Sequence, residues 1–199
     1  MARTTLERDV EALESRLGPL PEPVARPYLV VVSGLPGVGK TYFARALAQR
    51  LPATVLESDR LRKQLVRQPT HSQEESARLF AAAHALLERL LQRGVPVIFD
   101  ATNLVERHRE YLYAIAERAG ARVVLVMLDA PAGVIKERLS RRIEAPDPEE
   151  HSSADWAVYQ RMKPTLEPSR RAFYRVDTSK DITPALDKVE REVRKWLDG

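Results

Sequence analysis

The segment Gly34-Leu35-Pro36-Gly37-Val38-Gly39-Lys40-Thr41 constrains this chain more than any other feature, because it matches the pattern Gly-x-x-x-x-Gly-Lys-Thr. The glycines let the backbone curl so that successive N–H groups point at phosphate oxygens. A lysine in the position of Lys40 reaches the β- and γ-phosphates, and a hydroxyl in the position of Thr41 is a ligand for Mg²⁺. We therefore predict that residues 34–41 bind a nucleoside triphosphate together with Mg²⁺.

The residues around this loop alternate between strand-like and helix-like patterns. The run 28–32 is short, apolar and rich in β-branched residues, which predicts a buried strand, and a helical pattern follows over 41–51. Further strands are expected at 54–56, 95–99, 122–128 and 172–176, with helices between them. Buried strands joined by helical crossovers predict an α/β fold with three layers, a five-stranded parallel sheet and the topology of a P-loop NTPase.

The N-terminal residues are set apart by a cluster of prolines. Residues 18–27 contain four of them, which favours a stiff extended linker and divides the chain into residues 1–27 and a domain over 28–199. An amphipathic helix is expected before the linker, with one apolar stripe made by Leu6, Val10, Leu13 and Leu17. The stripe is explained most simply by packing on the domain, and a contact with a partner or a second copy is the alternative.

Composition excludes several classes of protein. The chain of 199 residues has no cysteine, which removes disulfide scaffolds and thiol chemistry, and it has no apolar run long enough to span a membrane. The N-terminus lacks an apolar signal core, so we expect a cytoplasmic protein. The net charge of +4 is too small to argue for nucleic acid as a partner.

Three further segments make the resemblance to a family specific. They are Glu57–Arg62 after the second expected strand, Val97–Asn103 at the third, and Glu137–Arg142 near the predicted lid. With the phosphate-binding loop, they resemble the P-loop kinase group that contains polynucleotide kinase, zeta-toxin-type kinases and chloramphenicol phosphotransferase. The resemblance covers residues 28–180 and implies an ATP-dependent kinase that transfers the γ-phosphoryl group to a hydroxyl.

The resemblance assigns the catalytic carboxylate to Asp59. A kinase needs a carboxylate to orient the acceptor hydroxyl and accept its proton, and a strand-end position places Asp59 on the side of the phosphate-binding loop. The alternative is that Asp59 only caps the helix that follows. In polynucleotide kinases the residue matching Arg62 binds the phosphate of the acceptor, which implies a substrate-binding role for Arg62 and an anionic acceptor here.

Asp100 ends the strand that we expect beside the loop strand. It is placed to hold Mg²⁺ with Thr41, directly or through water, and contact with the acceptor is equally open. A turn leading into the next helix is the structural alternative. We expect Asn103 to be the N-cap of that helix, because Asn103 and Glu106 have the spacing of a capping box.

Arg138 and Arg142 are four residues apart and therefore share one face of a helix. Their spacing is similar to that of the arginines in adenylate kinase lids, which implies that they close over the nucleotide and its phosphates. Phosphoryl transfer needs such mobile cations, so we predict a short lid over about 138–163 with catalytic roles for both arginines. Arg141 is a competing candidate.

The acceptor is not specified by the sequence. We expect a small molecule, with a polynucleotide 5′-hydroxyl as the alternative, and an ATP-binding interaction module without phosphotransfer as a third reading. Low aromatic content, 6%, disfavours a stacking surface for nucleic acid. No Asn-Lys-x-Asp sequence is present to select guanine, and the nearest stretch, Thr178-Ser179-Lys180-Asp181, does not match that pattern.

Overall fold

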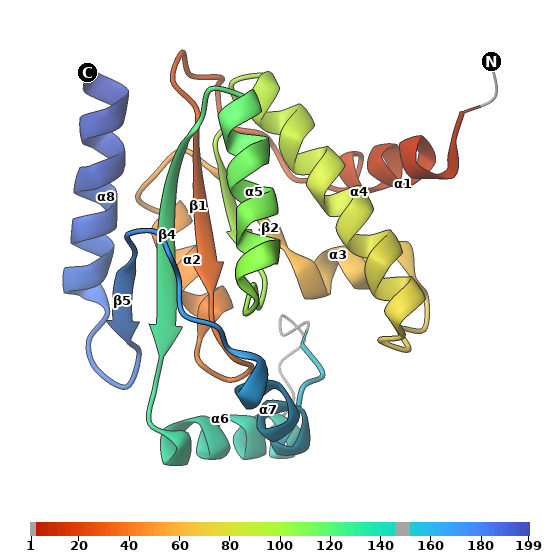
Figure 1. Cartoon of the computed structure of the whole chain (residues 1–199), viewed down its shortest axis with the longest axis vertical. Helices are drawn as coiled ribbons and strands as arrows, with labels where there is room; N and C mark the ends of the chain where they lie inside the picture. Colours follow the sequence, from red (N-terminus) through yellow and green to blue (C-terminus); the bar gives the residue numbers. More distant parts are fainter. Residues whose placement is uncertain (1–2, 146–151) are drawn as a thin grey trace.

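The computed structural model describes residues 3–145 and 152–199 (Figure 1). Five strands form one sheet in the order β2-β3-β1-β4-β5, and every neighbouring pair is parallel. In chain order the elements are α1 (Thr5–Glu14), β1 (Tyr28–Ser33), α2 (Lys40–Ala48), β2 (Thr54–Glu57), α3 (Ser58–Leu65), α4 (Gln73–Gln92), β3 (Val97–Asp100), α5 (Glu106–Arg118), β4 (Arg122–Asp129), α6 (Ala132–Glu144), α7 (Trp156–Met162), the 3₁₀ turn η1 (Lys163–Thr165), β5 (Tyr174–Asp177) and α8 (Thr183–Asp198).

Helices cover both faces of the sheet, so the fold has the three predicted layers. Successive side chains of a strand point to opposite faces, and β1 is buried along its whole length. Val30 packs in an apolar cluster with Phe43 of α2 and Val189 of α8. Its neighbour Val31 packs in a second cluster with Leu86 of α4. These two cores confirm the α/β fold and hold β1, which leads into the phosphate-binding loop, rigidly at the centre.

The N-terminal helix packs on the domain. Val10 and Leu13 of α1 are buried in the same cluster as the apolar side of α4. The carboxylate of Asp9 accepts two hydrogen bonds of 2.6 Å from Arg78 on α4. The linker is also tied down, because the N–H of Val24 donates to the carbonyl of Gly94 at 2.8 Å. Packing on the domain, the simpler of the two readings of the apolar stripe, is therefore the observed one.

The expectation that Asn103 caps α5 is wrong. The helix begins at Glu106 with Val105 as its N-cap, and Asn103 adopts a left-handed backbone conformation with φ of 46°. The N–H of Glu106 instead donates to the carboxylate of Glu167, at 2.7 Å. A residue that is distant in sequence thus performs the capping that local spacing assigned to Asn103.

The region of the predicted lid begins with α6, which lies across the lower end of the sheet in Figure 1, and it ends with α7 close to α6. The middle of the predicted lid, residues 146–151, lies outside the described residues. No helix within the described ranges is long and apolar enough to cross a membrane.

Candidate functional site

The phosphate-binding loop has the backbone that its glycines permit. Gly37 and Gly39 have φ values of 78° and 89°, a region that side chains other than glycine rarely adopt. A Cβ atom on Gly37 would lie 2.9 Å from side-chain atoms of Ile135 and Leu139 on α6. The loop is therefore shaped by its own conformation and by close packing against the helix that starts the lid.

Asp100 lies beside this loop because β3 pairs with β1. In the parallel register Asp100 is opposite Val32, and the hydroxyl of Thr41 donates a 2.7 Å hydrogen bond to the Asp100 carboxylate. Burial raises the pKa of Asp100 to about 6, and the neighbouring Lys40 ammonium and the hydrogen bond from Thr41 only partly oppose this. A buried carboxylate whose negative charge is only partly balanced by its neighbours favours the binding of a cation.

The oxygen atoms of Thr41 and Asp100 fit Mg²⁺. This ion prefers oxygen ligands and usually keeps one or two protein ligands together with waters and substrate phosphates. Among residues 3–145 and 152–199 there is no cluster of three or more acidic, histidine or cysteine side chains that could form a complete protein cage. The site therefore suits an ion that arrives with a nucleotide.

A cavity of about 130 Å³ brings most of the predicted site residues together. Its lining includes Lys40 and Thr41 of the loop, Asp59, Asp100, and Arg142 from α6. The cavity is therefore bordered by the phosphate-binding loop, by the ends of β2 and β3, and by α6, which starts the predicted lid. A carboxylate, cations and a phosphate-binding loop around one cavity can orient an acceptor and stabilise a transferring phosphoryl group.

Asp59 lies in the first turn of α3 and is not its cap. The N-cap is Glu57, and no hydrogen bond to the Asp59 carboxylate is found within the described ranges. The structural alternative of a capping aspartate is therefore wrong, and the side chain is available to the cavity that it lines. Its catalytic role stays a prediction.

Glu57 is a buried acidic residue of the site that sequence reasoning missed. It ends β2 directly opposite Asp100 in the register, and its carboxylate accepts hydrogen bonds of 2.9 and 3.3 Å from Arg45 on α2. The nearby carboxyl groups of Glu57 and Asp59 both add to the rise in the pKa of Asp100. Its strand-end position, shared with Asp100, was the signal that could have identified it.

Arg62 is held away from the phosphate cavity. Its guanidinium bonds to Glu75 and Ser76 of α4, and both members of the Arg62–Glu75 ion pair are 8% exposed. Glu75 also accepts hydrogen bonds from Thr70 and His71, and these bonds, with that from Arg62, lower its pKa to about 2. This carboxylate, which the sequence did not single out, fixes the loop between α3 and α4.

A second cavity, of about 190 Å³, lies on the other side of Asp59. Arg62, Lys63 and His71 line it together with Asp59. The imidazole Nε2 of His71 lies 3.3 Å from the hydroxyl of Ser153, so the loop before α4 meets the segment that leads to α7. Asp59 thus stands between the phosphate cavity and this cavity, and the role of Arg62 in binding an acceptor stays a prediction.

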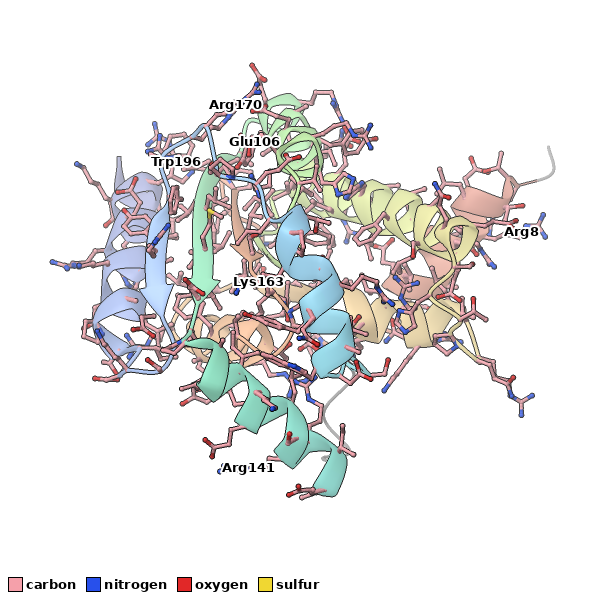
Figure 2. The ribbon with its side chains drawn as sticks, turned by 60° about the horizontal axis from the view of Figure 1, so that its bottom comes forward. Arg8, Glu106, Arg141, Lys163, Arg170 and Trp196 are labelled. Carbon is pink, nitrogen blue, oxygen red and sulfur yellow. The ribbon has the colours of Figure 1, made fainter. Side chains whose placement is uncertain are left out.

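The predicted lid arginines differ in their surroundings. Arg138 donates to the hydroxyl and the carbonyl of Thr178, at 2.9 and 2.6 Å, and that hydroxyl donates to the carbonyl of Val38 in the phosphate-binding loop at 2.7 Å. Arg142 lines both the phosphate cavity and a neighbouring cavity of about 490 Å³. Arg138 and Arg141 also line the larger cavity, and Arg141 pairs with Glu137 on the outer side of α6 (Figure 2).

The end of the lid region is anchored by a buried arginine. Arg109 on α5 is 0% exposed, and it donates to the carboxylate of Glu106 and to four backbone carbonyls. Those carbonyls belong to residues 103 and 104, just after Asp100, and to residues 167 and 168, just after η1. Glu106 also accepts a hydrogen bond from the N–H of Arg170, and Figure 2 shows the two residues side by side.

Comparisons with known proteins show which family the chain resembles. A family model described as an AAA domain matches residues 29–169. An L-seryl-tRNA(Sec) kinase of Methanococcus maripaludis is 28% identical over 112 residues, which are 55% of this chain and 44% of that protein. A UPF0200 protein of Aeropyrum pernix is 34% identical over 125 residues, which are 57% of this chain and 64% of that protein. The chain thus spans less than two thirds of the length of these curated relatives.

Solved structures show the same fold at low identity. The APS kinase CysC of Mycobacterium tuberculosis, in complex with AMPPNP and APS, aligns with a TM-score of 0.62 at 20% identity over 89% of this chain and 100% of that one. Kti12 of Chaetomium thermophilum, in complex with ADP-AlF3, gives 0.65 at 20% identity over 86% and 100%. A gluconokinase of Sinorhizobium meliloti gives 0.56 at 22% over 86% and 92%. These neighbours are P-loop kinases and related proteins of several kinds, and they do not single out the polynucleotide kinase group.

Proposed function

The chain belongs to the AAA-domain family whose model it matches, and from this premise we propose that it is an ATP-dependent kinase that phosphorylates a hydroxyl of a small molecule. The observation that carries the proposal is the cavity of about 130 Å³ that Lys40, Thr41, Asp59 and Asp100 line together. These residues supply the parts that phosphoryl transfer requires, which are a phosphate cradle, a cation site and a carboxylate near the acceptor.

In this mechanism Asp59 orients the acceptor hydroxyl and accepts its proton as the oxygen attacks the γ-phosphorus. The bond between that phosphorus and the bridging oxygen of ATP breaks, and ADP leaves. Lys40 and Arg142 line the same cavity and balance the negative charge that spreads over the transferring group. When bound between Thr41 and Asp100, Mg²⁺ would supply further positive charge to the phosphate oxygens.

The space near Asp59 supports a small acceptor. The cavity beyond Asp59 has a volume of about 190 Å³, below the roughly 300–1,000 Å³ typical of sites for drug-sized ligands. The contact between His71 and Ser153 joins two of its walls. A compact metabolite fits this space more readily than a folded nucleic acid.

The test is transfer of label from γ-³²P-ATP to a panel of small hydroxyl compounds. Asp59→Asn should lower kcat by roughly 100-fold or more, the usual contribution of a general base, without changing ATP affinity. Asp198→Asn is the matched control, because Asp198 is exposed at the end of α8 and lies far along the chain from the loop. Unchanged turnover in Asp59→Asn would remove Asp59 from the mechanism.

A nucleic-acid acceptor is the second candidate, and one of the relatives favours it. That relative is named as a kinase of seryl-tRNA, and α3 exposes the basic side chains of Arg60 and Lys63 beside the site. The same assay should therefore include a 5′-hydroxyl oligonucleotide and a tRNA that carries a seryl group. Transfer to either one that weakens steeply with salt would favour this candidate.

A third candidate is an ATP-binding interaction module. It predicts nucleotide binding that Lys40→Ala abolishes, without transfer to any acceptor in the panel. The assay therefore separates the three candidates by what becomes labelled, which is a small molecule, a nucleic acid or neither.

A further inference from the structure

The turn between β5 and α8 forms one wall of the cavity of about 490 Å³. Lys180 and Asp181 of this turn line the cavity together with Arg138 of α6, which donates hydrogen bonds to Thr178 at the start of the turn. They belong to the stretch Thr178-Ser179-Lys180-Asp181, which does not match the guanine-selecting pattern in sequence. The structure nevertheless places its lysine and its aspartate beside the phosphate-binding loop.

This cavity is placed to hold the nucleoside of a bound nucleotide. It shares Gly37, Gly39, Tyr42 and Arg142 with the phosphate cavity, so the two adjoin along the loop. Its volume lies within the roughly 300–1,000 Å³ of small-molecule sites. A nucleotide whose phosphates lie on the loop therefore extends its base toward the turn that carries Asp181.

Asp181 is the one carboxylate among the described residues that line this cavity. Its Oδ1 accepts a 2.9 Å hydrogen bond from the N–H of Thr183 at the start of α8, and hydrogen bonds from Thr183 lower the pKa of Asp181, so the group is ionised at neutral pH. An ionised carboxylate accepts at both oxygens and has about four lone-pair positions, so it retains capacity for a ligand donor.

We propose that Asp181 accepts hydrogen bonds from the amino group of the nucleobase, so that the site binds guanine nucleotides as well as adenine nucleotides. Guanine offers its N2 amino group next to the N1–H, a pair of donors that suits a carboxylate, whereas adenine offers only its N6 amino group, which lies beside an N1 acceptor and can give Asp181 a single hydrogen bond. Hypoxanthine has the N1–H and lacks the amino group. The inference rests on the nucleotide site of the proposed function and does not require phosphoryl transfer.

The experiment measures the affinities of ADP, GDP and IDP in the presence of Mg²⁺, by calorimetry, for the full chain and for Asp181→Asn. The asparagine keeps an oxygen that accepts from the N–H of Thr183, so the start of α8 is preserved. Asp198→Asn is the matched control, because Asp198 is exposed at the end of α8 and is not among the residues that line this cavity. Melting temperatures of all three proteins verify that folding is intact.

The expected result is that GDP binds within about tenfold of ADP and roughly tenfold more tightly than IDP, the order of a hydrogen bond to a charged group. In Asp181→Asn the gap between GDP and IDP should shrink to about twofold, because the amide NH₂ repels the amino group that the carboxylate accepted. Asp198→Asn should retain the full difference in affinity between GDP and IDP.

Equal affinities for GDP and IDP in the unaltered protein would overturn the inference. So would an Asp181→Asn protein in which all three nucleotides weaken by the same factor, because that result indicates a structural role only. Protein that prefers GDP over IDP yet transfers no phosphoryl group would retain this inference and refute the kinase. A protein that transfers a phosphoryl group from ATP but binds GDP and IDP equally would support the kinase and refute this inference.

Discussion

Replacing Asp100 with asparagine should stabilise the protein in the absence of nucleotide. The folded state raises the pKa of Asp100 from 3.8 to about 6, chiefly through burial, so ionisation of this group weakens the fold as the pH rises through about 6. At pH 7.5 the penalty is about 3 kcal/mol, since one pKa unit corresponds to about 1.4 kcal/mol. Asp100→Asn removes the charge and keeps an oxygen that can accept from Thr41.

The size of the effect should depend on pH in a defined way. At pH 5 the folded-state carboxyl is mostly protonated, so the same calculation gives a penalty of about 1.5 kcal/mol. Urea unfolding followed by circular dichroism, with EDTA present, measures both values. Asp198→Asn serves as the control, because Asp198 is exposed. An Asp100→Asn protein that is less stable than the parent at pH 7.5, or a gain that grows toward pH 5, would refute the reasoning.

Ligand addition should narrow the difference in stability between the two proteins. A ligand at 100 times its dissociation constant stabilises the folded state by about 2.7 kcal/mol. Mg²⁺ with ADP should give this gain to the parent protein and a smaller gain to Asp100→Asn, because the variant has lost the carboxylate that would hold the cation. Removing Mg²⁺ with EDTA should abolish the difference in gain between the two proteins.

Three further substitutions test the packing that positions the site. Leu13→Ala should destabilise the chain by roughly 2–5 kcal/mol in urea unfolding, because Leu13 is fully buried between α1 and the domain, whereas Leu6→Ala should cost much less. Arg109→Met should cost about 3–5 kcal/mol, because it removes the cation that pairs with the buried Glu106 carboxylate and the guanidinium that donates to four backbone carbonyls, while Arg118→Met, at an exposed ion pair, should cost much less. Gly37→Ala should weaken nucleotide binding at least about tenfold by calorimetry, because its φ of 78° and the 2.9 Å approach to α6 leave no room for a Cβ atom. Retained affinity in that variant would show that the loop adjusts freely.

The sequence predicted the fold because its signals are local and agree with one another. The apolar run at 28–32 is a fully buried strand, and the pattern of glycines after it produces the left-handed backbone of the loop. The strand-end position located Asp100, whereas Asp59 lies two residues beyond the end of β2, in the first turn of α3. Parallel pairing brings the ends of β2 and β3 to one edge. These inferences needed no knowledge of distant contacts.

The residues that sequence reasoning missed depend on contacts between distant parts of the chain. Glu167 caps α5 in place of Asn103, although it lies far along the chain from that helix. Arg109 and Glu75 look like ordinary helix-surface residues in sequence, and only the folded chain shows how many donors and acceptors meet at them. Asp181 likewise acquires a place beside the loop only through the turn that joins β5 to α8.

The order of strands in the sheet has a consequence for how the protein assembles itself. The strand that carries the phosphate-binding loop lies at the centre, and its two partners begin only at residues 97 and 122. Pairings between such distant segments close long loops, which makes them slow to form. During synthesis β1 therefore stays unpaired until β3 has been made, and one of its edges stays open until β4 has been made. The phosphate-binding loop is thus synthesised early, but the sheet that holds it in place forms only later. Before that sheet has formed, the unfinished chain is the form most prone to aggregation.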